Sequence, residues 1–202
     1  MISIVISVAF IISSFSLPSQ AVNAYDNKWG TFSTVKISGS GPDVVELKKP
    51  LRAGVIVMHH AGDHNFIVQS LNSRLGTDDL LANEIGNYTG SAVFGLGYSS
   101  SKVYGFEVEA EGRWTLTLKS FSKAAALGTK GTGSGVYKAW FNRRKIVKFT
   151  HDGDHNFIVQ QYCTNGTSDL LINEIGPYSG KKIVSAGSCL IQVTADGNWT
   201  IK

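Results

Sequence analysis

Apolar and polar residues alternate along the chain after residue 24 with a period of two rather than 3.6, which is typical of half-buried β-strands. Residues 106–109 read Phe-Glu-Val-Glu, and residues 189–194 read Cys-Leu-Ile-Gln-Val-Thr. Asp196 and Gly197 then form a two-residue hairpin signal, after which Trp199 and Ile201 alternate with polar neighbours. The pattern therefore predicts short antiparallel strands, each with one face in a core and one face in water.

Three motifs occur twice in the same order. Residues 64–69 (His-Asn-Phe-Ile-Val-Gln) recur letter for letter as residues 155–160, residues 79–90 recur with few changes as 169–180, and residues 112–116 match 197–201. Shared order with nearly constant spacing indicates a duplicated unit. We expect a first unit over residues 25–118, a linker over residues 119–130 and a second unit over residues 131–202.

Each unit is short and rich in strand patterns. We therefore predict an all-β protein made of two tandem small β-sandwich repeats with a jelly-roll-like arrangement. The 22 glycines and the low charged fraction of 17% suit strands joined by tight turns. The order of strands within a sheet does not follow from the pattern.

Residues 151–159 (His-x-Gly-Asp-x-Asn-Phe-x-Val), 169–180 (Asp-Leu-Leu-x-Asn-x-Ile-Gly-x-Tyr-x-Gly) and 195–201 (Ala-Asp-Gly-x-Trp-Thr-Ile) carry the most specific motifs. This combination resembles a module of exported proteins from Gram-positive bacteria, actinobacteria especially. The first unit carries related motifs, so the resemblance covers most of the chain after residue 24. It implies tandem β-sandwich modules and export, and it assigns no catalytic residue.

Residues 1–24 contain no charged residue, and residues 2–15 form a mostly apolar run. Val22 and Ala24 place small residues where signal peptidase accepts them, so we expect a signal peptide over residues 1–24 with cleavage after Ala24. The apolar run is shorter than the about 20 residues of a membrane-spanning helix. Because no Lys or Arg follows Met1, an uncleaved amino-terminal anchor is the alternative. Either way, we expect a protein that is secreted or associated with the cell envelope.

Both cysteines, Cys163 and Cys189, lie in the second unit and are in phase with apolar positions of their strands. In an exported protein such a pair is expected to form a disulfide. Two buried free thiols are the alternative.

The first turn of each unit carries histidines and aspartates that suit a Zn²⁺ or Cu²⁺ site open to solvent. The candidate metal residues are His60, Asp63, His64, His151, Asp154 and His155. The competing interpretation is that the aspartates form turns and the histidines bind backbone carbonyls. Oxygen-bearing residues suggest Ca²⁺ instead: Asp78, Asp79, Asn83 and Glu84, with Asp169, Asn173 and Glu174. A strand there would separate them onto two faces, so we expect no obligatory cofactor.

Two groups are candidates for ligand binding. Tyr88 and Tyr178 lie in Gly-x-Tyr-x-Gly turns and could stack on a sugar ring, whereas Trp114 and Trp199 are expected in the core. Residues 25–118 carry 8 Lys and Arg against 10 Asp and Glu, and residues 119–202 carry 11 against 5. A basic patch is therefore expected in the second unit, for teichoic acid, another anionic glycan or a membrane surface. It comprises Arg143, Arg144, Lys145 and Lys148, with Lys181 and Lys182 as further members.

Catalytic motifs are missing from the sequence. It has no Gly-x-Ser-x-Gly elbow and no phosphate-binding glycine pattern, so we predict a protein that is not an enzyme. The expected function is an exported, envelope-associated binding protein whose two modules engage a cell-wall polymer or glycan with avidity. The alternatives are a structural or interaction module for another protein and a metal-dependent enzyme. Nucleic acid is not an expected partner of an exported chain.

Overall fold

The computed structural model describes residues 19–96 and 102–202. Most of the expected signal peptide, residues 1–18, lies outside the described residues, so its prediction stays untested. The expected cleavage position after Ala24 falls inside helix α1 (Ser19–Trp29), which precedes the first strand. None of the described helices is long and apolar enough to cross a bilayer.

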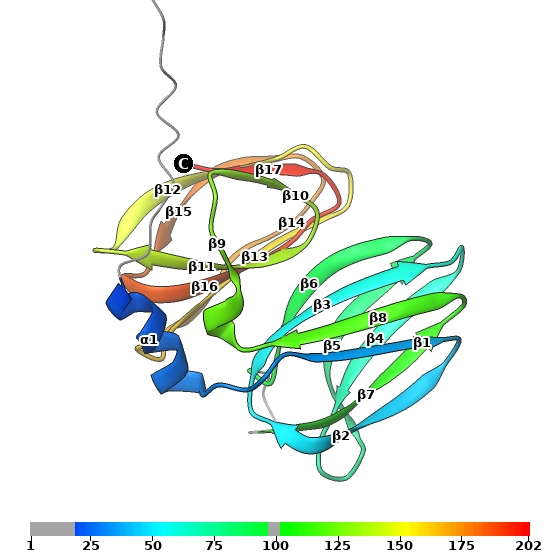
Figure 1. Cartoon of the computed structure of the whole chain (residues 1–202). Helices are drawn as coiled ribbons and strands as arrows, with labels where there is room; N and C mark the ends of the chain where they lie inside the picture. Colours follow the sequence, from blue (N-terminus) through cyan, green and yellow to red (C-terminus); the bar gives the residue numbers. More distant parts are fainter. Residues whose placement is uncertain (1–18, 97–101) are drawn as a thin grey trace, which may run out of the picture.

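The first unit is a sandwich of two four-stranded antiparallel sheets (Figure 1). One sheet has the order β1-β8-β3-β6 and the other has the order β2-β7-β4-β5. The strands are β1 (Val35–Ser40), β2 (Asp43–Leu51), β3 (Gly54–Ala61), β4 (Asn65–Leu71), β5 (Thr77–Ile85), β6 (Tyr88–Phe94), β7 (Val103–Ala110) and β8 (Arg113–Lys119).

The second unit repeats this strand order, with the sheets β10-β17-β12-β15 and β14-β13-β16-β11-β9. The short strand β9 is added to the edge of β11 in parallel orientation. The strands are β9 (Ala125–Ala126), β10 (Lys130–Thr132), β11 (Gly135–Phe141), β12 (Lys145–His151), β13 (Asn156–Cys163), β14 (Ser168–Ile175), β15 (Tyr178–Val184), β16 (Gly187–Thr194) and β17 (Asn198–Ile201).

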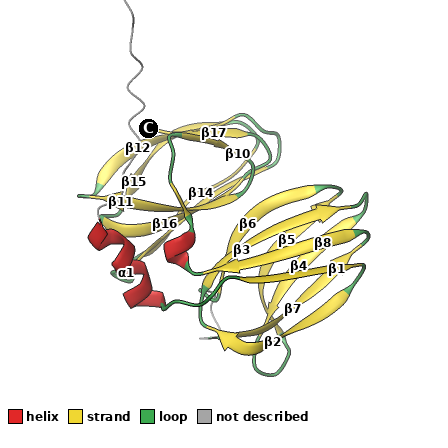
Figure 2. Ribbon diagram, in the orientation of Figure 1, coloured by secondary structure: helices red, strands yellow, loops and turns green. Residues whose placement is uncertain are grey.

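The protein is therefore all-β, and each unit has the eight-strand order of a jelly roll. Even the irregularities correspond, because a register shift occurs between Val68 and Gln69 in β4 and between Val159 and Gln160 in β13. Matching motifs thus occupy matching strands in the two units, which Figure 2 shows as two similar stacks of strands.

The hairpin predicted at Asp196 and Gly197 is wrong. Strands β16 and β17 flank this turn but belong to different sheets, since β16 pairs with β11 and β13 whereas β17 pairs with β10 and β12. The chain crosses from one layer of the sandwich to the other at this point. Alternation specifies only that each strand has one buried face, and two strands facing each other across a core satisfy that as well as a hairpin does.

Each sandwich has its own core. The alternating apolar residues meet between the sheets, and Trp114 and Trp199 are only 1% exposed at the centre of their units, as expected. Their indole N–H groups donate to the carbonyl oxygens of Gly41 (2.8 Å) and Gly133 (3.0 Å). Each tryptophan therefore ties the turn that follows β1 or β10 to the core.

A third core joins the two units. Tyr25 and Trp29 of α1 pack there with Phe121 of the 3₁₀ helix η1 (Phe121–Lys123), and Val93 and Leu190 contribute from the two sandwiches. The segment expected as a linker is thus a packed part of the interface. Direct hydrogen bonds also cross it: the backbone N–H of Val93 donates to Gln192 Oε1 (2.8 Å), and that of Val136 donates to Ser91 Oγ (2.9 Å).

The disulfide between Cys163 and Cys189 is confirmed. The two cysteines are direct partners on the neighbouring strands β13 and β16, and both are nearly fully buried. The bridge therefore links two adjacent strands of one sheet within the second unit.

Candidate functional site

The structure separates the histidines that the sequence places around the first turn of unit one. His60, at the end of β3, is buried, and its Nδ1 and Nε2 each lie 2.7 Å from a carbonyl oxygen, of Gly86 and Glu111 respectively. His64 lies outside the sandwich, where its Nδ1 is 2.5 Å from Glu111 Oε2. Backbone acceptors therefore occupy both nitrogens of His60, and neither is directed toward a metal shared with His64.

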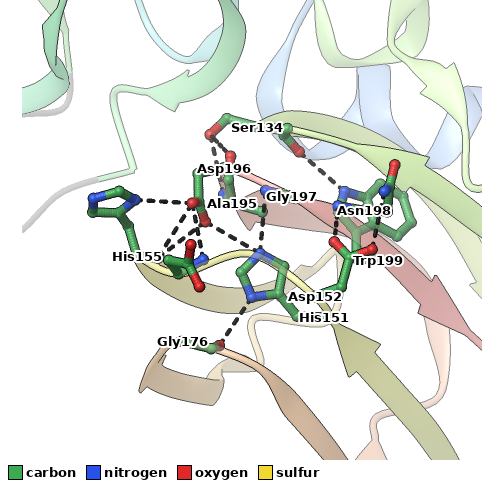
Figure 3. A network of polar contacts seen from close by, with 12 residues as sticks. Ser134, His151, Asp152, His155, Gly176, Ala195, Asp196, Gly197, Asn198 and Trp199 are labelled. Carbon is green, nitrogen blue, oxygen red and sulfur yellow. Dashed lines mark hydrogen bonds and ion pairs between the residues drawn. The ribbon is translucent and has the colours of Figure 1, made fainter.

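The second unit repeats this separation with a different carboxylate (Figure 3). Buried His151 contacts the carbonyl oxygen of Gly176 through Nδ1 (3.1 Å) and accepts from the N–H of Gly197 at Nε2 (3.3 Å). Exposed His155 contacts Asp196 Oδ2 through its Nδ1 at 2.9 Å. Asp196 takes the place that Glu111 has in the first unit.

No group of three His, Cys, Asp or Glu side chains with metal-binding geometry occurs among residues 19–96 and 102–202. The candidate metal residues do not converge because each pair straddles a turn between two sheets, so the first histidine points into the core and the second points outward. Among the described residues, neither Asp63 nor Asp154, both exposed, forms an ion pair with a histidine.

The residues suggested for Ca²⁺ also diverge. The Asp79 carboxylate accepts from the N–H of Gly95 (2.9 Å), and the Asp169 carboxylate accepts from the hydroxyl of Ser185 (3.1 Å). Both acidic groups thus fasten the neighbouring loop of their unit, and burial raises the pKa of Asp79. Asn83 and Glu84 lie at the other end of β5, at the junction of the two units.

Asp196 organises the turn of the second unit. Besides His155, it accepts the backbone N–H groups of Asp154 (3.1 Å) and His155 (3.2 Å). The His155 hydrogen bond, with these N–H donors, lowers the pKa of Asp196 to about 2. The same hydrogen bond and the negative charge raise the pKa of His155. The pair is therefore an imidazolium–carboxylate ion pair in mildly acidic solution.

We expect this pair to make stability depend on pH. Because the pKa of His155 is raised in the folded state, His155 contributes stability that is complete below its unfolded pKa of about 6.5 and is lost as pH rises through the folded pKa. Because the pKa of Asp196 is lowered in the folded state, Asp196 loses its contribution only as pH falls toward that lowered pKa. The melting temperature of wild type minus that of His155→Gln should therefore be larger near about pH 5 than near about pH 9. The effect is small because His155 is exposed. His59→Gln is the control, since His59 is also exposed and its Nδ1 lies beside the Thr89 hydroxyl instead of a carboxylate; an equal pH dependence in both variants would contradict the assignment.

A groove of about 600 Å³, lined by both polar and apolar groups, lies between the two units beside this turn. Tyr88, predicted to stack on a sugar, and His155, predicted to bind a metal, both line this groove. Its lining from the first unit is Asn83, Glu84, Ile85, Asn87, Tyr88 and Thr89. Its lining from the second unit is Gly133, Ser134, His155, Asn156, Thr194, Ala195 and Asp196.

The electrostatics of the groove are set by burial and by Asp196. Burial, followed by the negative charge of Asp196, raises the pKa of Glu84, which His155 partly opposes. Burial and the charge of Glu84 raise the pKa of Tyr88 to about 12, and the nearby Ser134 of the second unit opposes this shift. The tyrosine therefore stays protonated at neutral pH.

The two candidate tyrosines have different surroundings. Both rings pack on a core phenylalanine, Tyr88 on Phe66 (5.8 Å between centroids) and Tyr178 on Phe157 (5.6 Å). Only Tyr88 lines the groove between the units. Equal motifs thus have unequal roles, because one copy of the turn faces the other unit.

The basic residues lie apart from this groove. Arg143 and Arg144 are exposed in the turn between β11 and β12, and Lys145 lies 5.4 Å from the centre of the Phe141 ring. Lys148 is exposed on the outer face of β12, directly opposite Lys181 on β15. The predicted basic patch therefore extends from a turn onto a sheet face.

Several groove residues were not predicted as site residues from the sequence, among them Ser134, Asn156 and Asp196. The signal available for Asp196 is the acidic residue before a glycine at the same place in both units, Glu111 and Asp196. No motif marks Ser134, whose role depends on the second unit meeting the first.

Comparison with known proteins adds no assignment. No protein-family model matches the chain, and no curated protein matches it.

Proposed function

We propose that this protein is an exported, envelope-associated binding protein that holds a neutral glycan segment of a cell-wall polymer in the groove between its two units. The observation that supports this most is the gathering of side-chain amides, carboxylates, an imidazole and a tyrosine around one groove of about 600 Å³. A volume of this size is within the usual range for small-ligand pockets.

The groove chemistry suits a polyhydroxylated ligand. Asn83, Asn87 and Asn156 each offer both a donor and an acceptor, and Glu84 adds an acceptor beside them. Sugar hydroxyls both donate and accept, so such a lining can satisfy several of them at once. The Tyr88 side chain adds apolar surface at the wall.

Binding is a better fit than hydrolysis. Asp196, the carboxylate across the groove from Glu84, already accepts from His155 and two backbone N–H groups, and its pKa is about 2. It is thus held ionised as a structural acceptor and is poorly suited to act as a general acid. The disulfide is compatible with an extracellular location.

Sedimentation of residues 19–202 with isolated Gram-positive cell walls tests the proposal, because this segment contains every described strand. We expect binding that persists as salt is raised, and we expect Asn83→Ala with Asn156→Ala to weaken it about tenfold through lost hydrogen bonds. The matched control is Asn173→Ala with Asn65→Ala, which changes the equivalent asparagines of the other unit in each case.

The salt series separates two ligand classes. Binding that disappears with salt and that requires Arg143 and Arg144 would instead assign the ligand to an anionic polymer at the basic turn. Equal loss in the two asparagine variants, or no binding at any salt concentration, would reject the groove as the glycan site.

A further inference from the structure

The face that joins the two units inside the chain has a bare counterpart on each unit. Within the chain, the outer face of β3 and β6 in unit one covers the outer face of β11 and β16 in unit two. Unit two has its own copy of the first face, on β12 and β15, and unit one has its own copy of the second, on β2 and β7. Neither counterpart is covered within the described chain.

The face on β12 and β15 of unit two is equivalent in position to the face on β3 and β6 of unit one, but its apolar side chains are exposed. Val55 and Val93 are cross-strand partners on β3 and β6, and both are buried against the second unit. The equivalent cross-strand pair on β12 and β15 is Ile146 and Ile183, which are 67% and 54% exposed. Two large apolar side chains thus occupy the place of an interface without a partner.

The face on β11 and β16 of unit two is likewise buried, whereas the equivalent face on β2 and β7 of unit one is exposed. In unit two, Val136 and its partner Gln192 contact Ser91 and Val93 of the first unit through the two hydrogen bonds that cross the interface. In unit one the equivalent pair is Val44 and Glu107 on β2 and β7. Val44 is 53% exposed, and its N–H donates to its own neighbour Asp43 (2.8 Å) instead of a hydroxyl from another unit.

The two bare faces carry opposite charge. Lys148 and Lys181 flank the isoleucine pair and stand directly opposite each other, an arrangement of like charges that destabilises an isolated sheet. The bare face of unit one carries Glu107 and Glu109, which also line a hollow of about 680 Å³. By the internal correspondence, Lys148 and Lys181 of one copy would lie over Val44 and Glu107 of another.

We propose that copies of this protein associate head to tail, with the β12–β15 face of one copy covering the β2–β7 face of the next. The contact would repeat the interface already present between the units, with lysine–carboxylate pairs added. Because the two surfaces differ, the contact is heterologous, and each addition leaves one free face of each kind. Such an assembly would carry one groove per copy along a polymer and would raise avidity.

Sedimentation velocity of residues 19–202 over a concentration series tests this. We expect species heavier than the monomer as concentration rises. Lys148→Glu with Lys181→Glu should weaken association at least about tenfold, and Glu107→Lys with Glu109→Lys should do the same from the other face. Two control variants make the same charge changes at other exposed positions and should leave association unchanged. They are Lys36→Glu with Arg113→Glu, and Asp63→Lys with Glu174→Lys.

Mixing the two charge-reversed proteins gives the sharper readout. Neither protein has two complementary faces of its own, whereas in the mixture the native faces complement each other and so do the charge-reversed faces, so association should return on mixing. A wild type that stays monomeric at every concentration would overturn the proposal, as would a mixture without a complex. Monomers that bind anionic vesicles through Lys148 and Lys181 would also overturn it and would assign the lysine face to a charged surface. Cell-wall binding by a monomeric protein would leave the groove proposal standing alone.

Discussion

Replacing Tyr25 by alanine should lower the free energy of unfolding by about 3–5 kcal/mol, the range for truncating a large buried aromatic side chain. Tyr25 is fully buried in the core that joins the two units and packs beside Trp29, with ring centroids 6.0 Å apart. Its hydroxyl lies 2.9 Å from the carbonyl oxygen of Ala139 and 2.8 Å from that of Cys189. Urea unfolding followed by tryptophan fluorescence measures the change.

Tyr25→Phe separates packing from hydrogen bonding. It keeps the ring and leaves the two carbonyl oxygens without the hydroxyl, so we expect a smaller loss of about 1–3 kcal/mol. Burial raises the pKa of the Tyr25 hydroxyl well above its usual range, so the group remains a donor in any neutral or mildly basic buffer. Equal stability of Tyr25→Ala and wild type would show that α1 does not hold the units together.

Removing the disulfide should have the second large effect. The bridge closes a loop with a sequence separation of 26 residues, for which chain entropy gives a stabilisation of about 3.5 kcal/mol. Cys163→Ala with Cys189→Ala should therefore lower the free energy of unfolding by about 3–4 kcal/mol, measured by urea unfolding. Both positions are buried, so the missing sulfur atoms add a packing loss.

Reduction provides the control for this prediction. A reducing agent that opens the bridge should destabilise wild type and leave the double alanine variant unchanged. The first unit has Asn72 and Tyr104 at the corresponding positions, so the loss should be confined to the second unit. Wild type with the same unfolding midpoint in oxidising and reducing buffer would contradict the expectation.

Both structural effects bear on the proposed groove. Its two walls come from different units, and their relative position depends on the core that contains Tyr25. Tyr25→Ala should therefore weaken glycan binding even though the residue is not among those lining the groove. Loss of the disulfide should affect binding less, because Cys163 and Cys189 lie within one sheet of the second unit.

The local pattern determined a large part of the fold. Alternation placed Trp114, Trp199 and the core residues on the correct faces, because a period of two assigns each side chain to one side of a strand. The repeated motifs predicted two similar units, and the phase of Cys163 and Cys189 predicted their bridge. These features depend only on neighbours along one or two strands.

Strand pairing was decided by tertiary structure. The turn at Asp196 and Gly197 has the sequence of a hairpin, yet it connects two layers, because β17 finds its partners in β10 and β12. A different crossing, in the turn between β12 and β13, leaves His151 in the core and His155 on the surface, with Asp196 in contact with both, and so separates the expected metal residues. A sequence pattern states which side of a strand is buried but not which strand lies beside it.

The groove was decided by the contact between units. The sequence by itself determined an all-β chain of two related modules with a disulfide in the second, because those properties follow from alternation and phase along single strands. Only the tertiary structure made the surroundings of Tyr88 differ from those of Tyr178 and placed Ser134 near Tyr88, because closely similar motifs acquire different neighbours when one unit packs on the other. It likewise left Ile146 and Ile183 exposed on the second unit, whereas the equivalent Val55 and Val93 of the first unit are buried against the second.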